Sequence, residues 1–360
     1  MRQVIFWVIA VAVVAGAAGI VALRIPAVQD ILMRRMIARR MSASSKQLWS
    51  DDALRVLLCG TSSPMPHPTR AKACVAVFAA GRFWIVDTGL GSWNRLAQWR
   101  VDGRNIGGIF LTHFHSDHIG ELGEFNMQTW AAGRPAPLRV FGPPGVERVV
   151  AGFTEAYALD SGYRTAHHGA ALLPPDVGRM QAQVIAGPAE GAGPTIVIQE
   201  GGLTITAFAV NHKPVVPAYG YRFDYRGRSV VISGDTAKDS GLIAAAKGAD
   251  VLLHEAQANY IVAMMREAAE QAGRTRIAKI LGDIPSYHTS PVQAAEAANE
   301  AGVRLLVLYH LTPPPPAALV ERAFVRGVDA VRPRDWILAD DGLLITLPVG
   351  SDAVDVGRLD

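Results

Sequence analysis

Short apolar runs separated by turn residues make up most of the chain after position 50, and they alternate with segments of helical spacing. This alternation is typical of an α/β protein, in which buried strands are followed by helices that cover a sheet. The predicted helices are at 92–99, 146–158, 260–272, 276–281 and 291–301. The predicted strands are at 54–59, 73–78, 83–86, 107–111, 138–141, 195–199, 203–210, 219–225, 229–233, 251–254, 304–309, 336–339 and 343–347.

The chain has 360 residues, of which 50% are apolar, so a large core can form. We expect the α/β domain to span residues 51–350. Within it, residues 160–194 are rich in Gly, Pro and Ala and are expected to form a long loop, which in a compact domain usually has a function.

The amino-terminal segment carries a different pattern. Residues 4–23 contain no charged side chain, and at about 1.5 Å per residue they reach about 30 Å, enough to cross a bilayer. A transmembrane helix is therefore predicted within residues 1–25, ahead of the α/β domain. The alternative is a cleaved signal peptide, because residues 15–19 are small and suit a cut, and the protein would then be secreted.

A basic linker, residues 26–50, follows the apolar segment. In residues 31–41 apolar side chains recur at helical spacing and arginines fill the other side, so this helix lies either along anionic headgroups or against the domain. The arginines after the span would place the domain in the cytoplasm by the positive-inside rule, whereas an export signal would place it outside. We expect a single-pass protein of the inner (cytoplasmic) membrane with a periplasmic catalytic domain.

Charge is distributed unevenly along the chain. Residues 1–46 carry seven basic side chains and one acidic one, a net charge of +6, while the whole chain carries +3. The remainder is therefore mildly acidic, with a net charge of −3. A broad surface for nucleic acid needs a basic stripe to neutralise phosphates, so this balance disfavours a nucleic-acid partner.

The two cysteines, Cys59 and Cys74, each lie in or beside a predicted strand, with a Pro-rich loop between them. Neighbouring strands would bring them within disulfide range, but two buried free thiols are equally compatible with the sequence. No CxxC pair is present, which disfavours a cysteine metal site.

The most informative stretch is Thr112-His113-Phe114-His115-Ser116-Asp117-His118-Ile119-Gly120, which follows an apolar run that predicts a strand. Neutral imidazole nitrogens and carboxylate oxygens are the usual ligands of open zinc sites. His113 and His115 lie two positions apart and point to one face of an extended segment, while Asp117 and His118 lie around the turn. One loop therefore offers ligands to two metal ions, as two-metal hydrolases require. A polar loop of surface histidines is the alternative, but clustering His and Asp is costly unless a cation offsets the cost.

Further ligand-type residues follow apolar strands, at the ends where open α/β sheets carry their chemistry. Any one of them alone would more often be a structural polar residue, and it is their shared location that favours a site. They are His212, Asp235, His254, Glu255 and His310, joined by His288, which precedes a helix.

Taken in the order Asp87, the 113–118 motif, His212, Asp235 and His310, these residues resemble the metallo-β-lactamase superfamily over roughly residues 54–348. The resemblance implies a four-layer αβ/βα sandwich. True β-lactamases of this superfamily lack the bridging aspartate that Asp235 matches, so a penicillin substrate is not expected. The finer motifs are similar to the ribonuclease Z and arylsulfatase-like branch, and they are Gly60-Thr61-Ser62-Ser63-Pro64, Ser233-Gly234-Asp235-Thr236, His254-Glu255-Ala256 and His288-Thr289-Ser290.

The resemblance also implies roles for single residues. His288 would lie near the leaving group as a proton donor, Glu255 would orient it, and Asp87 would orient a metal ligand without binding metal. Asp117 would, in addition to binding metal, accept the proton of the attacking water in passing. The implied cofactor is two Zn²⁺ ions, with Mn²⁺ or Fe²⁺ as alternatives. The implied ligands are His113, His115 and His212 for one ion, Asp117, His118 and His310 for the other, and Asp235 as a bridge.

The expected activity is hydrolysis of a small phosphodiester or sulfate ester by metal-activated water. Ribonuclease Z-like cleavage of tRNA precursors is the alternative. It is disfavoured because those enzymes carry a basic, glycine-rich arm, whereas residues 160–194 hold only Arg164 and Arg179 as fixed positive charges. A non-catalytic, membrane-tethered binding module is a further alternative, and the complete set of seven ligands argues against it. The expected partners are a small anionic ester, the membrane through the amino-terminal helix and a second copy in a homodimer.

Overall fold

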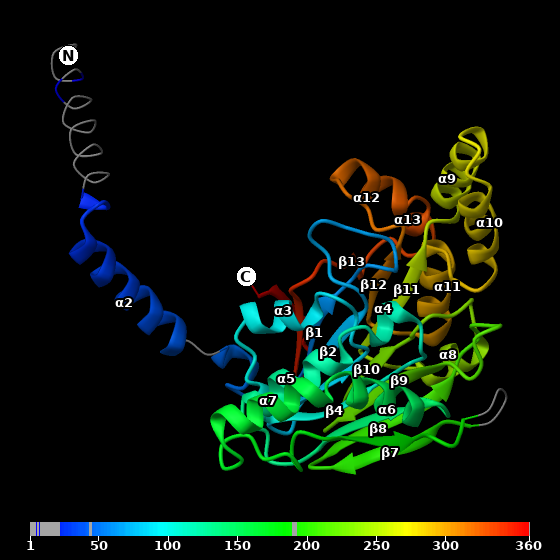
Figure 1. Cartoon of the computed structure of the whole chain (residues 1–360). Helices are drawn as coiled ribbons and strands as arrows, with labels where there is room; N and C mark the ends of the chain where they lie inside the picture. The colour runs from blue at the N-terminus through cyan, green and yellow to red at the C-terminus, as the bar shows by residue number, and fades with distance from the viewer. Residues whose placement is uncertain (1–4, 6, 8–21, 43–44, 189–192, 360) are drawn as a thin grey trace. The chain divides into compact units, whose positions relative to one another are not determined.

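The structure is a computed structural model that describes residues 5, 7, 22–42, 45–188 and 193–359 (Figure 1). The chain divides into two compact units, Met1–Ser45 and Lys46–Asp360. The described part of the first unit contains helix α2 (Pro26–Ser42), which includes the helix expected at 31–41. The domain boundaries expected at residues 25 and 50 stay predictions.

The expected transmembrane helix is corrected by the structure. Among the described residues, no helix is both long enough and apolar enough to cross a membrane. Most of the predicted span, namely residues 1–4, 6 and 8–21, lies outside the described residues. The expected location in the inner membrane, with a periplasmic domain, is corrected on the same finding, because that expectation rested on a membrane-spanning helix.

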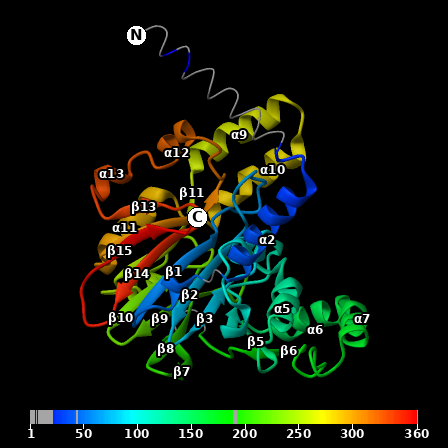
Figure 2. The same cartoon turned by 90° about the vertical axis from the view of Figure 1, so that its left-hand side faces the viewer.

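Two sheets form the body of the second unit. In the first sheet, neighbouring strands from β15 to β3 are antiparallel, and those from β3 to β6 are parallel. Figure 2 shows β15, β14, β1, β2 and β3 side by side in this sheet. Within the described ranges its eight strands are ordered β15 (Asp355–Arg358), β14 (Leu343–Pro348), β1 (Ala53–Gly60), β2 (Cys74–Ala79), β3 (Arg82–Val86), β4 (Ile106–Phe110), β5 (Leu138–Gly142) and β6 (Met180–Val184).

The second sheet packs against the first. Its strands β10 to β13 are parallel neighbours, and β7 to β10 are antiparallel neighbours. In the described part of the chain its seven strands are ordered β13 (Trp336–Leu338), β12 (Leu305–Thr312), β11 (Val251–Gln257), β10 (Arg228–Ile232), β9 (Tyr219–Tyr225), β8 (Leu203–Ala209) and β7 (Thr195–Glu200).

Helices cover the outer face of each sheet. Against the first sheet lie residues of α3 (Ser92–Gln98), α5 (Leu122–Ala131) and α6 (Val146–Ala156). Against the second lie residues of α8 (Ser240–Ala245), α11 (Pro291–Ala301), α12 (Ala318–Phe324) and α13 (Val328–Val331). The other helical segments are α4 (Ser116–Ile119), α7 (Ala158–His168), the pair α9 (Asn259–Gln271) and α10 (Thr275–Asp283), and the 3₁₀ turns η1 (Lys46–Leu48), η2 (Gly103–Asn105) and η3 (Ile284–Ser286).

Alternation of side chains along the strands builds this layering. On β1, Leu54, Val56 and Leu58 belong to the core between the two sheets, whereas Leu57 and Cys59 belong to the core beneath the helices. Successive side chains of a strand point to opposite faces, so one apolar strand serves two cores. The layers are therefore helix, sheet, sheet and helix, as the sequence analysis expected for the domain itself.

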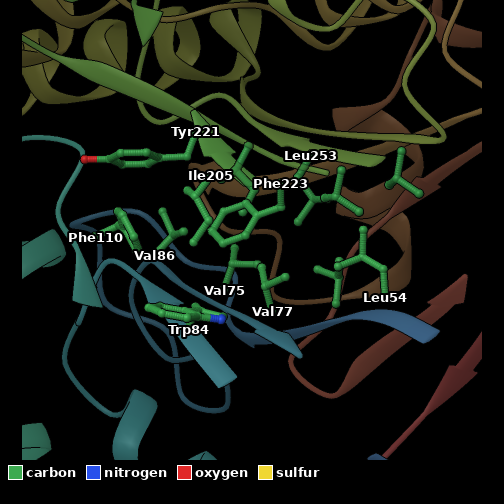
Figure 3. Packing of buried hydrophobic residues seen from close by; sticks show 14 of the residues in the cluster. Leu54, Val75, Val77, Trp84, Val86, Phe110, Ile205, Tyr221, Phe223 and Leu253 are labelled. Carbon is green, nitrogen blue, oxygen red and sulfur yellow. The ribbon is translucent and has the colours of Figure 1, made fainter. Parts of the chain in front are cut away.

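The core between the two sheets contains more buried residues than either core beneath the helices. Figure 3 shows Val75 and Trp84 of the first sheet facing Ile205, Phe223 and Leu253 of the second. All five side chains are almost completely buried. Burial of apolar area on this scale is the main stabilising contribution to the domain, and it fixes the relative position of strand ends from both sheets.

The long loop expected at 160–194 is wrong in part. Helix α7 covers its first residues up to His168, and β6 covers Met180–Val184. Helix α7 has no buried residue, and β6 is an edge strand with one buried side chain. Neither element forms a continuous apolar run, although Met180, Ala182 and Val184 of β6 alternate with glutamines as a strand would.

A disulfide joins Cys59 of β1 to Cys74 of β2, which decides between the two states that the sequence left open. The loop that it closes is also held by the buried carboxylate of Asp341, which accepts hydrogen bonds from the backbone N–H groups of Thr61 (3.0 Å) and Ala71 (2.7 Å). The Thr61 carbonyl in turn accepts from the N–H of Leu311, at 2.9 Å. This loop is thereby fixed beside residue 310.

Candidate metal centre

The 113–118 motif follows β4, at the carboxyl end of a strand in the parallel part of the first sheet, and its last three residues belong to α4. The second sheet holds the start of this loop in place. The Tyr221 hydroxyl donates to the carbonyl of Leu111 at 2.7 Å, and the N–H of Tyr219 donates to the carbonyl of Thr112 at 2.9 Å. Both tyrosines are buried in β9, so the histidine loop is anchored from the facing sheet.

The other predicted ligands come from the second sheet. His212 follows β8 and Asp235 follows β10, as expected. His310 differs from the expectation that it would follow its strand, because β12 continues through it to Thr312. Its φ of 46° lies in the left-handed region, a conformation that non-glycine residues adopt uncommonly.

The structure brings all seven predicted ligands together in two groups. The ligand atoms within each group lie within 4.8 Å of one another. In the second group, Nε2 of His310 lies 3.2 Å from Oδ2 of Asp117. The first group is His113, His115, His212 and Asp235, and the second is Asp117, His118 and His310.

Asp235 belongs to the first group and also lies near two histidines of the second. Its Oδ2 is 4.0 Å from Nε2 of His113 and 3.4 Å from Nε2 of His118, and its Oδ1 is 3.4 Å from Nδ1 of His310. A carboxylate in this position can contact two cations at once. Six of the seven side chains are buried and only His115 is exposed, so the cluster opens to solvent on the side of His115.

The ring orientation of His118 is fixed by Asp87. The Asp87 carboxylate accepts hydrogen bonds from the Thr112 N–H (2.8 Å), the Thr112 hydroxyl (2.9 Å) and Nδ1 of His118 (2.8 Å). Because Nδ1 of His118 carries the proton, Nε2 presents its lone pair to the cluster. Asp87 itself has a φ of 62°, a strained backbone held by these bonds.

The same logic applies to two further histidines. The Thr112 hydroxyl gives its proton to Asp87, so its oxygen accepts from Nδ1 of His113, at 3.0 Å. The carbonyl of Tyr287 accepts from Nδ1 of His212, at 3.1 Å. Each ring therefore turns the lone pair of Nε2 toward the cluster. The sequence analysis gave no role to Thr112 or Tyr287, although each directly precedes a histidine of the site.

Unpaired polar atoms test whether the cluster suits a cation. Nε2 of His118, Nε2 of His212, Oδ1 of Asp235 and Nδ1 of His310 are buried and have no hydrogen-bond partner among the described residues. Buried polar atoms left without partners are costly, and imidazole nitrogens and carboxylate oxygens together suit Zn²⁺. The residues present therefore fit a metal site.

Burial alone would lower the pKa of His118, but the carboxylates of Asp235, Asp117 and Asp87 outweigh it and raise that pKa well above its usual range, so a cation bound here would displace a proton from His118. Burial lowers the pKa of His113 well below its usual range and keeps this imidazole neutral, as a metal ligand must be. Burial alone would raise the pKa of Asp117, but the neighbouring His118 and His310 outweigh it and lower that pKa to about 2. Burial is likewise outweighed at Asp235, whose pKa the same histidines hold well below its usual range. Both carboxylates are therefore charged at neutral pH.

His288 and Glu255 form a buried pair at the edge of the cluster. Nδ1 of His288 donates to Oε1 of Glu255 at 2.9 Å, and the same oxygen accepts from the N–H of Thr289 at 3.1 Å. Burial disfavours the charged imidazole, but the Glu255 carboxylate outweighs it and raises the pKa of His288 to about 9. The His288 ring centroid lies 5.4 Å from that of His212 and 6.0 Å from that of His310. A protonated imidazole therefore stands beside the predicted ligands.

His254, which the sequence analysis placed at a strand end, lies within β11 and belongs to neither group. It is fully buried in β11, and its Nδ1 donates to the carbonyl of Glu255 at 2.8 Å.

Comparison with known proteins agrees with this geometry. Residues 83–311 match the family model described as "Beta-lactamase superfamily domain". The chain is 37% identical over 263 residues to a ribonuclease Z of Mycobacterium bovis (strain BCG / Pasteur 1173P2), covering 72% of this chain and 86% of that protein. It is 36% identical over the same length to a ribonuclease Z of Mycolicibacterium gilvum (strain PYR-GCK), covering 72% and 85%.

Solved structures share the fold at lower sequence identity. The short form of human tRNase Z superposes with a TM-score of 0.57 at 20% identity, covering 82% of this chain and 99% of that one. The metallo-β-lactamase fold protein YhfI of Bacillus subtilis gives a TM-score of 0.57 at 18% identity, covering 82% and 100%. These two structures support the fold and carry no information on the substrate.

Proposed function

The chain belongs to the metallo-β-lactamase superfamily and is a metal-dependent hydrolase of ester bonds, and we propose that it cleaves phosphodiesters in RNA, as a ribonuclease Z-like enzyme. The observation that carries this proposal is Asp235, whose carboxylate reaches histidines of both ligand groups. Relatives at 37% identity named ribonuclease Z favour RNA over the small ester that the sequence analysis preferred. They lend no support to a sulfate ester or to a membrane partner.

The proposed ligands are those that the two groups contain. His113, His115 and His212 would hold one ion, Asp117, His118 and His310 the other, and Asp235 both. Zinc is the metal that this donor set suits best. Two such cations would activate a water molecule and neutralise the charge of the phosphodiester under attack.

Proton transfer involves His288 with Glu255, and also Asp117 in addition to its proposed role as a ligand. Asp117 accepts the proton of the attacking water in passing. Water oxygen bonds to phosphorus, the bond from phosphorus to the leaving oxygen breaks, and His288 donates a proton to that oxygen. Glu255 keeps His288 protonated at neutral pH, since it raises the pKa to about 9.

A small phosphodiester is the second candidate substrate, and one observation favours it. Arg164 pairs with Asp160 at 2.8 Å, and Arg179 pairs with Asp176 at 3.2 Å. The fixed positive charges of the segment that the sequence analysis compared with an RNA-binding arm are thus each matched by a carboxylate. A surface that binds folded RNA needs an excess of positive charge.

Two assays on the purified full chain decide between these substrates. Metal content is measured together with cleavage of a 3′-extended precursor tRNA and of bis-p-nitrophenyl phosphate. We expect bound zinc, cleavage of both substrates, and loss of both activities in Asp235→Ala. Cleavage of the small ester alone would support the second candidate, and absence of bound metal would refute both.

A further inference from the structure

A cavity of about 270 Å³ opens beside the predicted ligand His212. Both chain neighbours of His212 line it, Asn211 and Lys213. Its other walls include Pro144 and Pro188, and their side chains are apolar and rigid. An apolar cavity with a few polar groups at one side is typical of a small-molecule subsite.

Asn211 is held in place by its backbone while its side chain is available. The N–H of Asn211 donates to the Thr236 hydroxyl at 3.2 Å, and its carbonyl accepts from the N–H of Ala237 at 2.8 Å. Both partners directly follow Asp235 in the chain. The side-chain amide of Asn211 makes no hydrogen bond within the described part of the chain, although it lines the cavity. An amide there can both donate and accept, which is what the edge of a nucleobase requires.

We propose that this cavity receives the nucleobase of the nucleotide attached to the scissile phosphate, and that Asn211 is the specificity residue that recognises its edge. This inference rests on the phosphodiesterase function proposed above. Asn211 and Lys213 of the cavity are the chain neighbours of His212, and consecutive Cα atoms lie about 3.8 Å apart. A phosphate held at the metal centre would therefore bring its own base close to the cavity. Its volume admits one base and excludes a duplex.

The test compares five phosphodiesters that share a p-nitrophenolate leaving group. One carries a methyl group as its other substituent, and the others carry the four nucleosides through their 5′ oxygens. In Asn211→Ala we expect kcat/KM to fall about tenfold with the preferred nucleoside ester and less than twofold with the methyl ester. Equal losses on both esters, or no preference of the unmodified enzyme for any nucleoside, would overturn the proposal.

A second variant tests the cavity independently, in case Asn211→Ala does not fold correctly. Val216 lines the cavity and is 69% exposed, so Val216→Trp fills the space without disturbing the core. We expect it to raise KM for nucleoside esters only. The matched control is Val356→Trp, which alters a half-exposed valine of β15 outside this cavity. It should leave KM unchanged for both the methyl ester and the nucleoside esters.

Binding is measured separately from turnover. Calorimetric titration with nucleoside 5′-monophosphates should show binding to the unmodified full chain and weaker binding to Asn211→Ala and Val216→Trp. If the chain hydrolyses none of these esters, the proposed function fails. The titration still shows whether the cavity binds a nucleotide. Equal affinity in all three proteins would refute the subsite.

Discussion

Oδ2 of Asp87 lies 2.8 Å from Nδ1 of His118, and both side chains are buried. This hydrogen bond places the ring proton on Nδ1 and leaves Nε2 facing Asp235, at 3.4 Å. The metal-facing atom of one histidine is therefore set by a carboxylate 31 positions earlier in the chain, at the end of β3.

Asp87→Asn is the sharpest test of this relationship, because it preserves shape, replaces one carboxylate oxygen by an NH₂ group and removes the negative charge. An amide NH₂ facing His118 would favour the tautomer with the proton on Nε2, which cannot bind metal. We expect zinc affinity to fall about 10- to 100-fold, measured by competition with a chromogenic chelator. The control is Asp176→Asn, an aspartate whose side chain is 88% exposed. Unchanged affinity in Asp87→Asn would show that Asp87 does not set the tautomer.

Zinc should also stabilise the folded chain, because it satisfies buried atoms that have no partner among the described residues. At a free zinc concentration about 100-fold above Kd, the gain is about 2.7 kcal/mol, which raises Tm by several degrees. In His115→Ala the gain should shrink while the metal-free Tm stays the same, since His115 is exposed. His168→Ala, an exposed histidine on α7, is the control. An equal zinc response in all three proteins would exclude His115 as a ligand.

Much of the site could be predicted because its residues follow apolar strands. The strands expected at 203–210, 229–233 and 251–254 overlap β8, β10 and β11, and parallel strands bring their carboxyl ends to one edge. Apolar runs are a strong signal when both faces of a strand are buried, as they are in β10 and β11.

The missed features lack such a signal. Strands β6 and β15 are the two edges of the first sheet, and β15 has no buried residue, so no apolar run marks it. The role of Thr112 depends on Asp87 and His113 together, a contact that exists only after folding. The backbone of His310 is set by tertiary packing, and local sequence does not encode its positive φ.

The Cys59–Cys74 disulfide should contribute to stability. It closes a loop with a sequence separation of 15, for which the loss of chain entropy in the unfolded state amounts to about 3 kcal/mol. We expect Cys59→Ala/Cys74→Ala to lower the urea midpoint, and a reductant to lower it for the unmodified chain but not for the variant. A midpoint that is equal in both proteins would mean that the bond adds nothing.

Glu255→Gln should shift the pH dependence of hydrolysis. Burial opposes a charge on His288, and Glu255 outweighs it, so the pKa of about 9 keeps the imidazole protonated at neutral pH. A proton donor works below its pKa, and activity should therefore decline as pH rises through this value. Replacing the carboxylate by an amide lowers the pKa and moves the alkaline limb of the kcat profile to lower pH, by about one unit or more. An unmoved limb would assign it to another group.

His288→Ala should be most harmful where the leaving oxygen needs a proton. Cleavage of RNA releases an alkoxide, a strong base, whereas bis-p-nitrophenyl phosphate releases a weakly basic phenolate that departs without protonation. We expect kcat to fall about 10²-fold or more with precursor tRNA and less than tenfold with the aryl ester. Zinc content should remain that of the unmodified chain, because His288 belongs to neither ligand group. Equal losses on both substrates would mean that His288 acts by positioning the predicted ligand His212, whose ring it contacts. Its role as proton donor would then be refuted.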